Sequence, residues 1–329
     1  MIDGILDNGI QLILWLQGLG DWIIPPMKAF TFLGSENFYF LIPPILFWVV
    51  DITLAVRVGM ILMLTSILNN LIKWRLHLPR PFMYDGRVQA LTEETTFGAP
   101  SGHSQTPLSL FGLIAFTVKK RWFWVLTGVV IFFVGISRMV LGVHFHLDVL
   151  MGWTLGILGI WLFVRVEDGV KDWYQKFNPW GQVGVALAAS FGLILVGVLT
   201  LAVFGGFHIP AEWEQNALLA FPDAEFNPFD ITVIITPAAT LFGLLAGLSW
   251  LGAQGGFNVA GVPWKLLLRI LVGVVGVVVL WQGLGAVFPR NPDLLSYSLR
   301  YLRYGLVGFW ISGWAPWLFV RLGLAERAK

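Results

Sequence analysis

Long apolar runs, separated by short polar stretches, dominate the sequence. A transmembrane helix needs about 20 predominantly apolar residues. By this criterion the pattern predicts nine spans, near residues 37–53, 55–76, 104–118, 122–140, 147–166, 184–204, 231–252, 266–288 and 302–322. We therefore expect an all-α protein, a polytopic transmembrane helical bundle of about nine spans.

Residues 1–33 follow a different pattern, in which polar side chains recur at helical spacing and Pro25-Pro26 interrupts the run. A clean span would not carry such a stripe, so we predict one or two amphipathic helices lying at the membrane interface. A tenth, kinked span is the alternative. A cleaved signal peptide is disfavoured, because this segment is acidic rather than basic at its start.

The composition supports a membrane protein. Hydrophobic residues make up 57% of the chain and charged residues only 12%, against roughly 25% charged in a typical soluble chain. So few charges cannot cover a soluble surface, which excludes a cytosolic enzyme and a disordered chain. A net charge of +2 leaves little excess for a phosphate backbone and excludes a nucleic-acid partner. Without cysteine the chain has no disulfide and no thiolate nucleophile.

The distribution of Lys and Arg predicts an orientation, because cytoplasmic loops carry more of them. If Lys119, Lys120 and Arg121 face the cytoplasm, 12 of the 21 basic residues lie on that side. The N-terminus is then outside and the C-terminus cytoplasmic.

Three polar clusters fall at the outer ends of the spans, where ionisable groups indicate function. The first ends the second span with Lys73, Arg80 and Pro81. Lys73 and Arg80 are seven residues apart, so on one helix they share a face and together suit an anion. The alternative is that both side chains only snorkel at a helix end.

The second cluster, Pro100-Ser101-Gly102-His103, opens the third span. It predicts a turn into a helix, with Ser101 as the N-cap and free backbone N–H groups that can cradle an oxyanion. An ordinary capping turn is the alternative.

The third cluster consists of Ser137-Arg138, His144 and Asp148. His144 and Asp148 are spaced i, i+4 on the fifth span, so the carboxylate can fix the imidazole tautomer and leave the other nitrogen free to attack. A structural His–Asp pair in the core is the alternative. Gly142 predicts a break between helices that lets Arg138 and His144 point into one cavity.

Zinc needs three or more convergent ligands. On a helix His144 and His146 point apart, and neighbouring cations would repel a metal ion. The clusters therefore indicate phosphoryl transfer with no metal and no cofactor, in which Lys and Arg neutralise the developing charge.

The pattern K-x6-R-P, P-S-G-H and S-R-x5-H-x3-D resembles the type 2 phosphatidic acid phosphatase superfamily, which also includes vanadium-dependent haloperoxidases. The resemblance covers roughly residues 30–165. It implies a phosphatase core at 34–183, preceded by the interfacial segment 1–33 and followed by a four-span extension at 184–329 with no assigned role. Residues 34–39 look like the bacterial and sphingosine-phosphate phosphatase branches, and an outer N-terminus with nine spans is similar to glucose-6-phosphatase.

The resemblance also implies a role for each motif residue. His144 is the nucleophile that forms a phosphohistidine, Asp148 holds its tautomer, and His103 protonates the leaving alcohol and then activates water. The phosphoryl oxygens are bound by Lys73, Arg80, Ser101, Gly102 and Arg138. Three further residues are candidates for the substrate pocket, namely Glu36, His77 and Arg87.

We therefore expect a multi-pass membrane phosphatase that hydrolyses a lipid phosphate monoester or diphosphate at the outer membrane interface. Its partners are the lipid phosphate substrate and membrane lipids, and the sequence does not define an oligomeric state. Three alternatives stay open. They are a sugar-phosphate phosphatase, a lipid phosphotransferase, and a transporter or flippase, although no repeat between halves supports the last.

Overall fold

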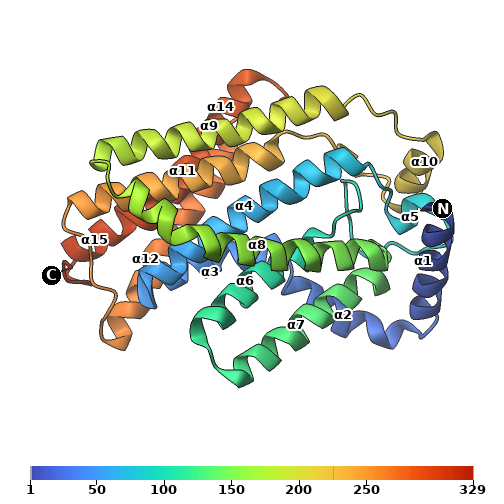
Figure 1. The fold of residues 1–329 in the computed structure, drawn as a ribbon, viewed down its shortest axis with the longest axis horizontal. Coiled ribbons are helices and arrows are strands. Elements are labelled where there is room, and N and C mark those ends of the chain that lie inside the picture. Colours follow the sequence, from blue (N-terminus) through green and yellow to red (C-terminus); the bar gives the residue numbers. More distant parts are fainter. Residues whose placement is uncertain (1, 225, 329) are drawn as a thin grey trace. The chain divides into compact units, whose positions relative to one another are not determined.

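The computed structural model describes residues 2–224 and 226–328, in which all regular secondary structure is helical (Figure 1). This confirms the all-α prediction. The α-helices are α1 (Ile2–Gln17), α2 (Ile24–Phe32), α3 (Glu36–Val49), α4 (Ile52–Leu76), α5 (Pro81–Tyr84), α6 (Gly102–Val118), α7 (Arg121–Val140), α8 (His146–Tyr174), α9 (Pro179–Phe204), α10 (Ala211–Ala220), α11 (Thr232–Ala253), α12 (Pro263–Val278), α13 (Leu284–Val287), α14 (Leu294–Phe309) and α15 (Ala315–Arg321). A 3-10 turn, η1 (Asp21–Ile23), and two π-helical segments, η2 (Val279–Gly283) and η3 (Trp310–Trp314), complete the set.

Six helical stretches of the described chain are long and apolar enough to cross a membrane. They are Ile52–Tyr84, Arg121–Val140, His146–Tyr174, Pro179–Phe204, Thr232–Ala253 and Pro263–Val287. Helices also lie at the other three expected positions, but α3 has 14 residues and α6 has 17. At 1.5 Å per residue, α6 is about 26 Å long, against a hydrocarbon core of about 30 Å. Nine spans therefore stay a prediction.

The N-terminal segment forms the helices that its polar stripe predicts. Along α1, Leu6, Ile10 and Ile13 are buried in the same core cluster as Val140 and Phe145. The apolar face of α1 is thus covered by protein. That the N-terminal helices lie at the membrane interface stays a prediction.

The described chain forms two compact units, each assembled from separate segments. The first comprises the residues up to Tyr39 together with Leu68–Trp161 and Gly197–Asp230, and the second comprises Phe40–Ile67, Leu162–Val196 and the chain from Ile231 onward. Four helices, α3, α4, α8 and α9, contribute residues to both units. The proposed functional division into 1–33, 34–183 and 184–329 stays a prediction.

In the first unit, α6 and α7 are neighbouring helices joined at Lys119 and Lys120 (Figure 1). Two glycines of α8 allow α6 to come close. A Cβ on Gly156 would lie 2.8 Å from the Leu108 side chain, and a Cβ on Gly152 would lie 2.5 Å from the Ser101 carbonyl oxygen. This close packing brings the start of α6 to the start of α8, where two of the three motifs meet.

In the second unit, α11 and α14 pack through glycines. A Cβ on Gly243 would collide with the Gly305 carbonyl, and one on Gly308 would collide with the Thr240 carbonyl. Backbone contact of this kind is typical of small-residue helix packing in membranes.

Candidate active site

All three sequence motifs converge in the first unit. Lys73 lies near the end of α4, Arg80 directly precedes α5, and Arg138 lies in the last turn of α7. These cations are buried, as are His144 and Asp148. Because charged side chains are almost never fully buried without partners, the contacts of this cluster are the central feature of the site.

Lys73 and Arg80 do not share a helix face, so this prediction is wrong. Helix α4 ends at Leu76, and His77 adopts a positive φ of 51° that turns the chain out of the helix. The two cations nevertheless meet at Thr96. Lys73 Nζ and Arg80 Nη2 donate to its hydroxyl at 3.0 and 3.1 Å, and Arg80 Nε donates to its carbonyl at 2.6 Å.

The predicted break at Gly142 is confirmed. Helix α7 ends at Val140, Gly142 has φ +73°, and α8 begins at His146. His144 therefore precedes α8 rather than lying on it, which corrects the expected i, i+4 helical pair. The pair forms all the same, with His144 Nδ1 3.3 Å from Asp148 Oδ2. The Phe145 N–H donates to the same oxygen at 2.9 Å and fixes the carboxylate.

The other ring nitrogen of His144 faces a guanidinium. Nε2 lies 3.1 Å from Arg80 Nη1, which also donates to the Val143 carbonyl at 3.0 Å. An arginine can only donate hydrogen bonds, so Nε2 is the acceptor and Nδ1 carries the proton toward Asp148. Burial, reinforced by Arg80, lowers the pKa of His144 well below its ordinary value. The imidazole is thus neutral at pH 7, with its lone pair among the cations.

The Pro100–His103 turn begins α6 as predicted, but Ser101 does not cap it with its side chain. Instead, the Ser101 hydroxyl lies 3.1 Å from the Ser104 hydroxyl, and the Ser101 amide donates to the Asp148 carbonyl at 3.0 Å. The Ser101 amide is therefore already used. The amides of Gly102 and His103 have no acceptor among the residues that the structure describes, so they are the groups of this turn that can bind an anion.

Glu94 is the residue of this site that sequence reasoning missed. Its Oε2 accepts from Arg80 Nη2 at 2.8 Å, and its Oε1 accepts from Arg138 Nη2. The same Oε1 lies 3.7 Å from His103 Nδ1. One carboxylate thus bridges residues from all three motifs. No motif pattern marks Glu94, and the sequence does not distinguish it from its neighbour Glu93.

The charges around Glu94 keep it ionised. Burial alone raises the pKa of this carboxyl, but Arg80 and Arg138 together lower it far more, so the pKa lies well below its usual range. The pKa of His103 is also lowered, to about 3, by burial and by the Arg138 charge, which keeps this imidazole neutral. The resting site therefore combines a carboxylate with two neutral imidazoles.

Arg138 connects the site to the N-terminal segment. Its Nη1 donates to the Thr31 hydroxyl of α2 at 2.6 Å. Its Nε is buried and has no acceptor among the described residues. Arg138 therefore keeps one donor for a ligand.

Two of the three candidate pocket residues, His77 and Arg87, lie outside this cluster. His77 stacks on Phe207 at 4.4 Å between ring centroids, and its Nε2 lies 2.9 Å from the Phe204 carbonyl. Arg87 is exposed and pairs with Asp85 at 2.6 Å, so its charge is neutralised locally. The side chain of Glu36 lies outside the part of the structure that is described.

An aromatic cluster adjoins the polar site along the chain. Phe97 follows Thr96 and is buried, with its ring 5.3 Å from Phe229 and 6.1 Å from Phe207. These partners belong to the segment between α9 and α11, in which residues 205–230 include five carboxylates and no Lys or Arg. In the structure this segment contains α10, and Asn216 of α10 donates to the Met83 carbonyl at 2.9 Å. The segment thus supplies apolar surface beside the cationic residues.

Comparison with known proteins gives two family matches. The PAP2 superfamily model matches residues 54–171, and the model described as PAP2 superfamily phosphatase, transmembrane extension, matches residues 235–327. Phosphatidylglycerophosphatase B of Bacillus subtilis is 31% identical over 170 residues, which cover 47% of this chain and 80% of that protein. Sphingosine-1-phosphate phosphatase 1 of Rattus norvegicus is 22% identical over 312 residues, 90% of this chain and 71% of the relative.

Another relative is lipid A 4'-phosphatase of Bacteroides thetaiotaomicron, 28% identical over 106 residues, which cover 32% of this chain and 47% of that protein. Among solved structures, the first transmembrane PAP2 type phosphatidylglycerolphosphate phosphatase from Bacillus subtilis matches with a TM-score of 0.44 and 24% identity, over 50% of this chain and 86% of that one.

The apolar helices and the family matches define an integral membrane enzyme, a phosphatase that hydrolyses phosphate monoesters of lipids. The chain belongs to the PAP2 superfamily.

Proposed function

We propose that this phosphatase works through a covalent phosphohistidine on His144, at the outer membrane interface, with the C-terminus cytoplasmic. The observation that carries the proposal is the His144 environment. Its Nδ1 faces Asp148 at 3.3 Å, and its Nε2 faces Arg80 at 3.1 Å. A neutral imidazole, oriented by a carboxylate and aimed at a guanidinium, is arranged to attack phosphorus held by that guanidinium.

Glu94 stands where we place the phosphoryl group. Its two oxygens occupy donors of Arg80 and Arg138, as two phosphoryl oxygens would. Lys73, the free Nε of Arg138 and the amides of Gly102 and His103 supply further donors. Substrate binding then replaces one carboxylate by a more highly charged phosphate, and the side chain of Glu94 moves aside.

In the first chemical step His144 Nε2 attacks phosphorus, and the bond from phosphorus to the lipid oxygen breaks. His103 gives its proton to that oxygen. In the second step a water oxygen attacks phosphorus and gives a proton to His103, and the bond from phosphorus to His144 Nε2 breaks, which releases phosphate and restores both imidazoles. A His103 with a pKa of about 3 is neutral in the resting site. The extra negative charge of bound phosphate raises that pKa, so protonation of His103 is coupled to substrate binding.

Ser101 acts as a positioning residue in this scheme. Its amide donates to the Asp148 carbonyl, and its side chain contacts Ser104 rather than the cations. It therefore holds α6 against α8. This differs from the direct phosphate contact that the family resemblance implies.

A lipid substrate is supported by the aromatic residues that follow Thr96 and by the relatives, whose names specify phosphatidylglycerol phosphate, sphingosine 1-phosphate and lipid A as substrates. A phosphate-release panel in detergent tests the choice. It compares phosphatidic acid, phosphatidylglycerol phosphate, sphingosine 1-phosphate, undecaprenyl diphosphate and glucose 6-phosphate, each with His144→Ala as a control. We expect release from a lipid phosphate that persists in excess EDTA. Preference for glucose 6-phosphate, or loss in EDTA with rescue by Mg²⁺, contradicts the proposal.

A further inference from the structure

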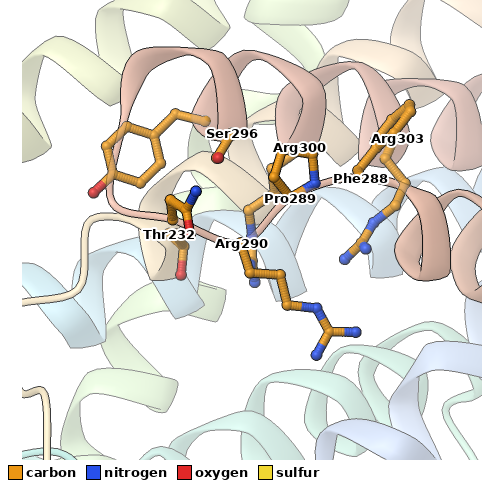
Figure 2. A pocket seen from close by; sticks show the side chains of 9 residues that line it. Thr232, Phe288, Pro289, Arg290, Ser296, Arg300 and Arg303 are labelled. Atoms are coloured by element: carbon orange, nitrogen blue, oxygen red, sulfur yellow. The ribbon is translucent and has the colours of Figure 1, made fainter.

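A second arginine cluster lies within the second compact unit, where the chain passes from α13 to α14. Figure 2 shows the pocket there. It contains about 370 Å³ of space not filled by protein atoms, part of which is open to solvent. The lining includes Thr232, Arg290, Ser296, Arg300 and Arg303. The enclosed part, in which a water-sized sphere fits, is only about 40 Å³, which holds a few water molecules or one small anionic group.

Three positively charged side chains line this pocket. Arg290 comes from the connecting loop, and Arg300 and Arg303 are spaced i, i+3 on α14, so they share one side of that helix (Figure 2). No carboxylate of the described residues lies within 4.0 Å of the three guanidinium groups. Like charges that share a site repel one another, so an anion between them lowers the energy of this arrangement.

Contacts with neighbouring residues hold all three arginines. Arg290 Nη2 donates to the Gly285 carbonyl at 3.3 Å. Arg300 Nε donates to the Thr236 hydroxyl at 2.8 Å, and Arg303 Nη2 donates to the Tyr304 hydroxyl at 3.0 Å. The Arg303 guanidinium also lies 4.6 Å from the centre of the Tyr304 ring. These bonds use only part of the donor capacity, because a guanidinium has five N–H groups.

One buried donor in this region, Nε of Arg303, lacks an acceptor within the described chain. Ser296 is also buried, but it lies beside the Asp293 carboxylate, which accepts from the Ser296 amide at 2.7 Å and faces the Ser296 hydroxyl. Unused donors at buried positions are rare in folded proteins and point to a missing acceptor.

The surroundings of the pocket are apolar and exposed. Val287 is 78% exposed, Leu294 82% and Leu295 63%. Val287 ends the candidate span Pro263–Val287, so the loop with Arg290 lies where a span meets the lipid headgroups. Exposed aliphatic side chains next to arginines match the boundary between acyl chains and headgroup phosphates.

We propose that Arg290, Arg300 and Arg303 form a second binding site for an anionic phosphate group, such as the headgroup phosphate of a membrane lipid. Arginine suits this ligand, because its planar fork donates two parallel hydrogen bonds to phosphate oxygens. The site belongs to the segment outside the three sequence motifs and takes part in no chemical step. It would anchor the α13–α14 connection to a negatively charged membrane surface.

The test counts ligands bound to the purified full chain in neutral detergent by native mass spectrometry. Dioctanoylphosphatidylglycerol, dioctanoylphosphatidylcholine and inorganic phosphate are titrated separately. The wild type is compared with Arg290→Gln/Arg303→Gln and with Arg165→Gln, which makes the same type of charge change at an exposed arginine outside the pocket. The active site is intact in all of them, so it contributes equally to every count.

We expect the double variant to bind phosphatidylglycerol about tenfold more weakly than the wild type, while Arg165→Gln binds it normally and phosphatidylcholine shows no difference. A matching loss with inorganic phosphate assigns the site to any phosphate, and a loss with phosphatidylglycerol alone assigns it to the lipid. Equal binding by the wild type and the double variant in both arms overturns the proposal. If the double variant does not fold, Arg290→Gln on the exposed loop must still weaken binding.

Discussion

The chain contains two arginine clusters that differ in what neutralises them. In the catalytic cluster Arg80 and Arg138 are buried, and both bind the carboxylate of Glu94. In the α13–α14 pocket Arg290 is exposed, Arg300 and Arg303 are half-buried, and none has a carboxylate within 4.0 Å among the described residues. Buried charge is costly unless it is paired. The catalytic cluster therefore contains its own anion, Glu94. The arginines of the α13–α14 pocket need no internal anion, because water solvates their charges.

This difference bears on function. In the proposed mechanism, phosphate displaces the internal carboxylate from Arg80 and Arg138. In the proposed second site, the partly solvated arginines bind an anion without such competition. We therefore expect weaker anion binding per arginine in the catalytic cluster than in the α13–α14 pocket.

The largest effect is expected from removing one guanidinium of each cluster. Arg138 and Arg300 are matched, because each donates to a threonine hydroxyl, Arg138 to Thr31 and Arg300 to Thr236. Arg138→Gln should lower kcat/KM by about 10²–10³-fold, the usual cost of losing a donor that stabilises transition-state charge. Arg300→Gln should leave kcat/KM close to wild type. Equal losses in the two variants would remove the functional distinction between the clusters.

Glu94→Gln tests whether the carboxylate occupies the phosphate position. Loss of one partner of a buried pair should destabilise the fold by about 3–5 kcal/mol. Orthovanadate, which mimics the transferring phosphoryl group, should then raise the Tm of Glu94→Gln by more than that of the wild type, since no internal anion competes. Equal vanadate shifts would mean that Glu94 does not hold the anion site.

The low pKa of His103 predicts a pH-dependent stability. The unfolded chain takes up a proton on this imidazole below about pH 6.5, whereas the folded chain does so only near its lowered pKa of about 3. Stability is therefore complete above pH 6.5 and is lost as the pH falls toward 3, by up to about 1.4 kcal/mol per pH unit.

Thermal unfolding in detergent from pH 7 to pH 5 measures this loss. His103→Gln should show a shallower fall in Tm than the wild type. His144 also lowers the stability as the pH falls, but it does so equally in the wild type and in His103→Gln. Glu94 titrates below the range from pH 7 to pH 5. Parallel curves would show that His103 is not held neutral in the folded protein.

Salt should affect ligand binding at the two clusters differently, although this difference is expected to be smaller than the effects of the substitutions above. Exposed charges are screened strongly and buried charges much less. Raising the salt concentration from 0.05 to 0.5 M should therefore weaken phosphatidylglycerol binding at the Arg290 pocket while changing KM for a short-chain lipid phosphate less. A larger effect of salt on KM than on phosphatidylglycerol binding would contradict the assignment of the catalytic cluster as buried and the α13–α14 pocket as solvent-exposed.

Fixed motif spacing selects Lys73, Arg80, Arg138, His144 and Asp148 from the sequence, and the structure brings these residues together. Their roles in catalysis stay a prediction. The sequence predicts local geometry less well. The positive φ of His77 ends α4 before Arg80. The sequence does not predict this turn, because a positive φ is normally indicated by glycine and this residue is a histidine. The break at Gly142 was predictable, because glycine tolerates the positive φ found there.

The contacts that depend on distant segments could not be predicted. Glu94 and Thr31 carry no motif, and their partners lie 44 and 107 residues away along the chain. The arginines at 290, 300 and 303 lack regular motif spacing and resemble ordinary interfacial side chains in the sequence. Their convergence on one pocket follows from the α13–α14 turn.

Trapping of the phosphoenzyme tests the central claim most directly. The measurement is acid-labile phosphate bound to the protein after rapid quench with a labelled p-nitrophenyl phosphate. We predict label on the wild type and none on His144→Ala. His103→Ala should accumulate label, because this leaving group needs little protonation while water lacks its base. Label on His144→Ala, or no label on any protein at times that allow turnover, would contradict covalent catalysis by His144.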